Sequence, residues 1–179
     1  MKTVYKVYFV YSLCTIRFSC AQIAVSETSD AAICDCFDSA VLGISVGANM
    51  QATLCVDTLD NAVMAYPALK GAIVHSDIGS QYTSQIYRDI IAKCNVIQSM
   101  NSDGGRCHDN ARCESMWARM KSELFYGRYD SQKFTKSELK IKIWRYFMSY
   151  WNNRRICSTN GGLPPMVKRR KNTISIINI

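Results

Sequence analysis

GAIVHSDIGSQYTSQIYRDIIAKCNVIQSM, residues 71–100, is the stretch that decides the fold of this chain. Its first segment, residues 71–77, is a short, mostly apolar run of the kind that is buried in a sheet. Residues 84–94 have the spacing of a helix, and residues 96–100 form a second strand-like run. This alternation of strand and helix predicts an α/β domain with a central sheet.

The alternation begins before this stretch and continues after it. Two β-type runs within residues 32–47 predict a hairpin, since polar turn residues separate them. Residues 51–66 place their apolar side chains on one face at helical spacing, and Pro67 stops the pattern. The remaining expectations are helices over residues 109–125 and 135–155, and an extended tail after Gly161.

Composition and charge indicate one globular domain with an anionic partner. A chain of 179 residues suffices for a single core, and it carries a net charge of +8. Residues 112–172 hold 15 Lys or Arg against 4 Asp or Glu, so the positive charge lies in the C-terminal third. The nine scattered cysteines favour a reducing cytoplasm, and no apolar run is long enough to span a membrane.

Asp77 is the first candidate for chemistry. It follows a buried strand, and ligand sites in open α/β sheets gather at the carboxyl ends of strands. The polar block HSDIGSQYTS, residues 75–84, surrounds it, and Gly79 allows a close turn. A lone Asp at a strand end is more often a turn or cap residue, so this position needs a second observation.

The helix expected over residues 109–125 provides that observation. Glu114 lies near its first turn, beside an apolar stripe that we expect to pack inward. The stripe consists of Cys113, Trp117, Met120 and Leu124. Lys121 returns to nearly the same angle as Glu114 two turns later, about 10.5 Å along the axis. A carboxylate and an ammonium group would then share one face, although periodicity alone favours a merely solvated helix side.

Four motifs in order give the chain a family resemblance. They are HSDIGSQYTS at residues 75–84, the DN-x-x-x-E pattern of Asp109, Asn110 and Glu114, the lysine at position 121, and YWNNRRICSTNGGLPP at residues 150–165. Together they resemble insertion-sequence transposases of the IS-three type, which are relatives of retroviral integrases. The resemblance runs from about residue 33 to residue 171.

This resemblance implies an RNase H-like fold, a mixed central sheet flanked by helices. It implies a polynucleotidyl transferase core for DNA transposition and integration, with Asp77 and Glu114 as the second and third members of a D,D,E triad. Here 36 residues separate the two, one more than the usual interval. Such triads hold two Mg²⁺ or Mn²⁺ ions for phosphodiester cleavage and strand transfer. We expect DNA contacts from Lys121, Arg112, Arg154 and Arg155.

The first aspartate of the triad is missing from its expected place. The resemblance puts it on the first strand, near residues 17–20, where the chain has no acid. Asp30 and Asp35 do not match the position. The first 30 residues lack the usual first-strand pattern, which suggests a frameshifted or truncated reading frame. We expect this strand to be replaced by residues 4–11 or to be missing, and the chain to be inactive by itself.

The expected organisation has three parts. Residues 1–31 are an atypical N-terminal segment, residues 32–160 the integrase-core-like domain, and residues 161–179 a basic tail. The expected partners are transposon ends and target DNA, further copies of the chain on DNA, and a companion helix-turn-helix protein, in the bacterial cytoplasm at the nucleoid. Two alternatives stand beside the transposase: a non-catalytic DNA-binding remnant and a decayed product without a role.

Overall fold

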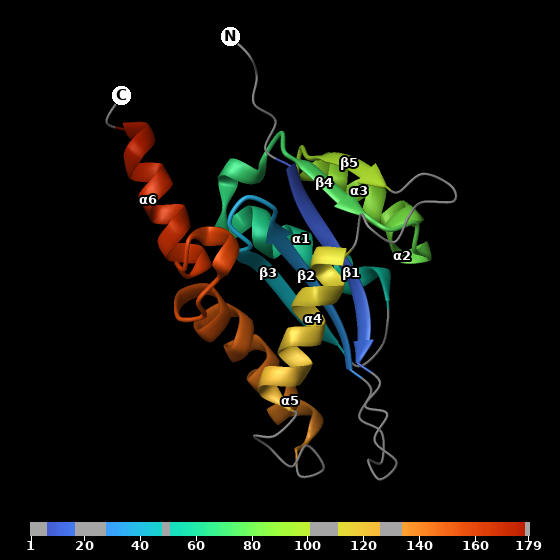
Figure 1. Ribbon diagram of the computed structural model, residues 1–179. Helices are drawn as coiled ribbons and strands as arrows, with labels where there is room; N and C mark the ends of the chain where they lie inside the picture. Colours follow the sequence, from blue (N-terminus) through green and yellow to red (C-terminus); the bar gives the residue numbers. More distant parts are fainter. Residues whose placement is uncertain (1–6, 17–27, 48–50, 101–110, 126–133, 178–179) are drawn as a thin grey trace.

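The computed structural model describes residues 7–16, 28–47, 51–100, 111–125 and 134–177, with side chains omitted at residues 7–16, 28, 111–114 and 173–177 (Figure 1). Its strands are β1 (Val7–Ile16), β2 (Thr28–Asp35), β3 (Val41–Gly47), β4 (Ile73–Ser76) and β5 (Ile97–Met100). Its α-helices are α1 (Ala52–Ala65), α2 (Ser80–Thr83), α3 (Gln85–Lys93), α4 (Ala111–Leu124), α5 (Lys136–Arg145) and α6 (Pro165–Ile177). Shorter helical segments are the 3-10 turns Pro67–Leu69 and Ser158–Asn160 and the π-helical segment Tyr146–Trp151.

The five strands form one mixed sheet in the order β3-β2-β1-β4-β5. β1, β2 and β3 are antiparallel neighbours, whereas β4 is parallel to β1 and β5 is parallel to β4. The expected mixed sheet is therefore confirmed. The first strand lies at Val7–Ile16 and overlaps residues 4–11, the segment expected to replace it, whereas the alternative that this strand is missing is wrong.

Side chains that alternate along β2 divide the core into two layers. Ala31 and Ile33 pack with α1 and α3, while Ala32 and Cys34 pack with α4, α5 and the π-helical segment. Successive strand residues point to opposite faces, so one buried strand supplies both layers. Figure 1 shows α4 crossing the sheet on the face opposite α1.

Local signals in the sequence fix the helix ends. The Ser84 side chain accepts a hydrogen bond from the Tyr87 N–H at the start of α3. Thr135 and Glu138 form a reciprocal capping box at the start of α5. The helix expected over residues 135–155 is confirmed, with one π-helical turn near its end. No helix among the described residues is long and apolar enough to cross a membrane.

The C-terminal tail corrects the sequence expectation, because it forms α6 where an extended segment was expected. Gly161 and Gly162 adopt positive φ angles of 66° and 79°, which end the preceding 3-10 turn. Pro165 then begins the helix, where its fixed φ suits the first helical position. The domain boundary expected between residues 31 and 32 therefore lies within β2. The boundary expected between residues 160 and 161 lies shortly before α6.

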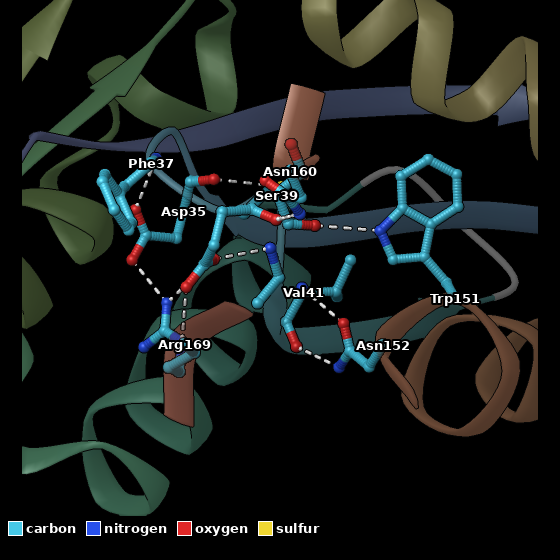
Figure 2. A network of polar contacts seen from close by, with 11 residues as sticks. Asp35, Phe37, Ser39, Val41, Trp151, Asn152, Asn160 and Arg169 are labelled. Atoms are coloured by element: carbon cyan, nitrogen blue, oxygen red, sulfur yellow. Dashed lines mark hydrogen bonds and ion pairs between the residues drawn. The ribbon is translucent and has the colours of Figure 1, made fainter. Parts of the chain in front are cut away.

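A polar network ties the C-terminal segments to the turn between β2 and β3 (Figure 2). The Asn152 amide donates to the Val41 carbonyl at 2.8 Å and accepts from the Val41 N–H at 2.9 Å. Trp151 Nε1 donates to the Ser39 carbonyl at 2.9 Å, and Asn160 Nδ2 donates to the Asp38 carbonyl at 2.7 Å. These bonds satisfy backbone groups of the turn and of Val41, the first residue of β3.

Arg169 of α6 completes the network from below the turn (Figure 2). Its guanidinium pairs with Asp35 and also lies 2.9 Å from Asp38 Oδ2. Burial, followed by the charge of Asp38, raises the pKa of Asp35 above its usual value, although the Phe37 N–H and Arg169 oppose this. Arg169 therefore offsets two carboxylates that are largely withdrawn from water.

Asp30 presents the opposite case on β2. It is fully buried, and neither carboxylate oxygen has a hydrogen-bond partner among the described residues. Burial raises the pKa of Asp30 to about 7, while the charges of Lys121 and Lys140 partly oppose the shift. The protein therefore binds a proton at this position when it folds near neutral pH.

We predict that Arg169→Ala destabilises the fold by about 3 kcal/mol, because it leaves two buried carboxylates without their cation. The loss is measured as the free energy of unfolding in urea. Arg170→Ala, at an exposed neighbouring position, is the matched control and should change stability by less than about 0.5 kcal/mol. Equal losses in the two variants would contradict the anchoring role.

A second prediction concerns Asp30, whose folded-state pKa lies above its unfolded value of 3.8. The stabilisation from its protonation is complete below about pH 4 and is lost as pH rises to about 7, up to about 4 kcal/mol. Asp30→Asn should flatten this slope and raise the unfolding free energy at pH 8 by roughly 1–3 kcal/mol. Asp57→Asn, on the exposed side of α1, should leave the slope unchanged.

Candidate active site

Asp77 lies directly after β4, on the face of the sheet that α4 covers. Val74 points into the layer of α1 and α3, so His75 and Asp77 fall on the opposite face by alternation. Asp77 is half-buried, so its carboxylate is still accessible from outside. The sequence expectation of a carboxylate at a strand end is confirmed in its position.

The turn after Asp77 holds its carboxylate in place. Asp77 Oδ1 accepts a hydrogen bond from the Gly79 N–H at 3.0 Å, and the Ser76 hydroxyl donates to the Asp77 carbonyl at 3.1 Å. A Cβ at position 79 would lie 2.9 Å from Asp77 Oδ1 and 2.4 Å from Gln81 Nε2. A larger residue here would make the Gln81 side chain and the Asp77 carboxylate shift, although the φ of Gly79, −57°, is open to any residue.

Behind this turn lie two buried aromatic rings and the Cys55 thiol. Tyr82 is fully buried, packs edge-on against Tyr87, and accepts a bond at its carbonyl from Gln98 on β5 at 2.9 Å. Burial raises the pKa of the Cys55 thiol to about 11, with Tyr82 opposing the shift and the Asp77 charge adding to it. Cys55 is therefore a neutral thiol, so the nearby chemistry falls to carboxylates.

Helix α4 carries the second sequence candidate, Glu114, within its first turn. Trp117 and Met120 are buried and Leu124 is half-buried, which confirms the expected inward stripe for these three residues. Met116 is also buried and joins the same layer, a contact that the four-residue stripe missed. α4 contacts β1, the strand beside Asp77. The side chains of Glu114, Arg112 and Cys113 lie outside the described residues.

The register between β1 and β4 indicates which residue of β1 lies level with Asp77 along the sheet. Val7, Tyr8 and Phe9 pair with Ile73, Val74 and His75, so continuing the ladder brings position 11 level with Asp77. Position 11 is also the partner of Ala32, whose side chain packs in the layer of α4. Directly paired residues share a sheet face. Position 11 is a tyrosine, and β1 contains no acidic residue. The expected place of the first aspartate, residues 17–20, lies outside the described residues.

The other acidic residues considered from the sequence do not complete the site. Asp35 is committed to Arg169 and the β2–β3 turn. Asp30 pairs with Cys14, three positions further along β1 than position 11, and its nearest described cations are Lys121 and Lys140. Among the described side chains, no group of three or more His, Cys, Asp or Glu could hold a metal ion, and this includes the Cys34 and Cys36 pair.

The basic residues expected to contact DNA have different surroundings. Lys121 is half-buried near Asp30, and Arg154 is exposed. The Arg155 guanidinium is paired within the protein, whereas the sequence predicted a contact with DNA. Its Nη2 lies 2.8 Å from Glu123 Oε1, and the guanidinium stacks 4.7 Å from the Trp151 ring. Tyr146 also donates to Glu123, at 2.8 Å. The sequence could not indicate this pairing, because 32 residues separate Arg155 from Glu123.

His75 supports the sheet, since its Nδ1 lies 3.0 Å from the Ser99 hydroxyl of β5. His108 lies outside the described residues. Trp151, Asn152 and Asn160 all lie in the motif at residues 150–165, and the sequence analysis did not predict their role as partners of the β2–β3 turn. The asparagines of this motif were the available signal, but their burial is visible only in the structure.

Comparisons with known proteins identify relatives. Residues 27–105 match the integrase core domain family. The chain is 34% identical over 138 residues to the probable transposase for insertion sequence element IS1353 of Shigella flexneri, covering 76% of this chain and 26% of that protein. It is 31% identical over 142 residues to transposase InsF for insertion sequence IS3A of Escherichia coli K12, covering 79% and 48%. The chain thus spans about half or less of these relatives.

Solved structures agree on the fold. The HTLV-2 integrase catalytic core domain in complex with magnesium, in its trimeric form, matches with a TM-score of 0.62, covering 90% of this chain and 94% of that one. A simian T-cell lymphotropic virus intasome matches with a TM-score of 0.63, covering 85% and 50%. Both share only 12% of their sequence with this chain, so the likeness concerns the RNase H-like fold alone.

Proposed function

We propose that this chain, which matches the integrase core domain over residues 27–105 and is similar to IS3-type insertion-sequence transposases, descends from an enzyme that cleaves and joins DNA strands with divalent metal ions. The observation that carries the proposal is the position of Asp77 on the sheet face covered by α4, the helix that contains Glu114. Asp77 thus follows a strand that pairs with β1, and the helix that contains Glu114 contacts the same strand.

The residues fit a divalent metal only in part. Asp77 and Glu114 would each supply a carboxylate oxygen, the donor that Mg²⁺ and Mn²⁺ prefer. A metal pair supplies charge stabilisation at the attacking and leaving oxygens of the phosphodiester. β1 supplies Tyr11 where a third carboxylate would be level with Asp77. The site as it stands therefore holds two of the three proposed ligands.

DNA is the proposed partner. The C-terminal third carries the excess of positive charge, and Lys121 with Arg112 and Arg154 would contact backbone phosphates. We include Arg155 only as a residue that shapes this surface, since Glu123 neutralises it. Transposon ends and target DNA would be the substrates, several copies would assemble on them, and a helix-turn-helix companion would choose the ends. Bacterial relatives favour the cytoplasm and nucleoid as the place of action.

A non-catalytic role in binding DNA is the second candidate, favoured by the tyrosine at position 11. The integrase-core unit proposed at residues 32–160 would then act with β1 and α6 as structural additions. In this case the chain would occupy transposon ends without cutting them. Metal-dependent cleavage separates the two candidates.

We predict that the unaltered chain does not cut or join DNA, and that Tyr11→Asp introduces metal-dependent cleavage. The substitution places a carboxylate level with Asp77, and a misplaced metal already costs about 100-fold in rate. Cleavage of a labelled transposon-end duplex with Mg²⁺ or Mn²⁺ measures the effect. Asp77→Ala in the Tyr11→Asp background should abolish it.

Tyr11→Asn is the matched control, because it changes size and polarity without adding a ligand charge. Mn²⁺ should raise the melting temperature of Tyr11→Asp but not that of Tyr11→Asn. Cleavage by the unaltered chain at a rate like that of Tyr11→Asp would mean that a third ligand is already present elsewhere. Absence of both the Mn²⁺ effect and cleavage in Tyr11→Asp would count against the proposed metal site.

For DNA affinity, we predict that Lys121→Ala weakens binding about equally for all sequences and lowers the slope of log K against log salt by about one. Fluorescence anisotropy over a salt series measures both quantities. Lys70→Ala, an exposed lysine at the opposite end of β4, is the control and should leave the slope unchanged. An unchanged slope in Lys121→Ala would place that lysine on a merely solvated face.

A further inference from the structure

A cavity of about 440 Å³ lies between α4 and the segment that follows the π-helical turn. Ser115 and Arg119 line it from α4, and Cys157, Ser158 and Thr159 line it from the opposite wall. Arg119 is five residues after Glu114, so it projects about 140° around α4 from Glu114. The cavity is therefore on a different flank of α4 from the proposed metal site.

The polar groups of this cavity suit an anion. Arg119 Nε donates to the Ser115 hydroxyl at 3.4 Å, and its Nη groups have no hydrogen-bond partner among the described residues. No carboxylate lines the cavity. Among the described side chains, the charge of Arg119 acts on Glu123, which is already bonded to Arg155 and Tyr146. Although burial favours its neutral form, these bonds hold the pKa of Glu123 below its usual value, so it remains an ionised and satisfied partner of Arg155.

The other residues that line the cavity suit a ligand larger than a single small ion. Hydroxyls at Ser115, Ser158 and Thr159 are joined by apolar surface from Met116, Trp151 and Ile156. Ile156 is 71% exposed at this site, an unusual position for a branched apolar side chain. Guanidinium and hydroxyl donors fit phosphate oxygens, and apolar carbon fits the face of a sugar.

We propose that this cavity binds one phosphodiester and its adjoining deoxyribose from the DNA backbone. The inference rests on the proposed function for the presence of DNA, but it uses no metal ligand. DNA would then contact α4 on both flanks, at Lys121 on one and at Arg119 on the other. The contact is independent of base sequence, because only backbone groups are recognised.

The test uses the full chain and a fluorescein-labelled duplex over a salt series without divalent metal. Arg119→Ala should weaken binding several-fold near 150 mM salt and lower the salt slope by about one. Arg119→Lys should keep the slope, since it keeps the charge. Arg88→Ala, an exposed helical arginine on the opposite face of the sheet, is the matched control and should change neither quantity.

Alkylation of Cys157 locates the contact, because this free thiol lines the cavity. Mass-spectrometric mapping should find that DNA slows alkylation of Cys157 but not of Cys36, and that Arg119→Ala removes the protection. Two results would overturn this inference and leave the proposed function standing. One is protection of Cys157 from alkylation by inorganic phosphate alone. The other is an unchanged salt slope of DNA binding in Arg119→Ala while the unaltered chain binds DNA. Failure of the unaltered chain to bind DNA would overturn both.

Discussion

The fold depends on β1, because it is the only strand that joins the two halves of the described sheet. Its one edge pairs antiparallel with β2 and its other edge pairs parallel with β4. These ladders are made by backbone N–H and C=O groups, which every residue except proline provides. The sequence VYFVYSLCTI meets this requirement through β-branched and aromatic residues, without any acid. A strand can therefore keep the architecture while omitting the carboxylate that the chemistry requires.

The same separation between architecture and chemistry appears at the β2–β3 turn. Asn152, Trp151 and Asn160 satisfy buried backbone groups of this turn, and Arg169 offsets its two carboxylates. None of these groups faces Asp77. They hold α6 and the π-helical segment against the sheet, which in turn supports the layer beneath α4. Residues in a family motif can thus be structural supports although they are neighbours of functional ones in the sequence.

Much of the fold could be predicted because it is written in local patterns. Periodicity predicted α1 and helices over residues 84–94 and 135–155, and the structure begins α3 and α5 directly after their capping residues Ser84 and Thr135. Long-range pairings could not be predicted in this way, since the bond between Arg155 and Glu123 and that between Arg169 and Asp35 join segments without a shared pattern. α6 was missed because its local sequence is ambiguous. Its helix begins at a proline after two glycines, a sequence that is equally typical of an extended tail.

For the site, the sequence analysis proposed Asp77 and Glu114 and expected the first aspartate near residues 17–20, which lie outside the described residues. Counting back from the hairpin assumes a fixed loop length, whereas extending the β1–β4 register by two residues points to position 11. The register also explains why Asp30 is no substitute. It shares the sheet face of α4, yet it lies beyond position 11 along β1, near Lys121 and Lys140. A buried carboxylate there lowers stability at neutral pH and adds no ligand beside Asp77. A third carboxylate at this face would therefore have to come from β1, and this strand contains no acidic residue.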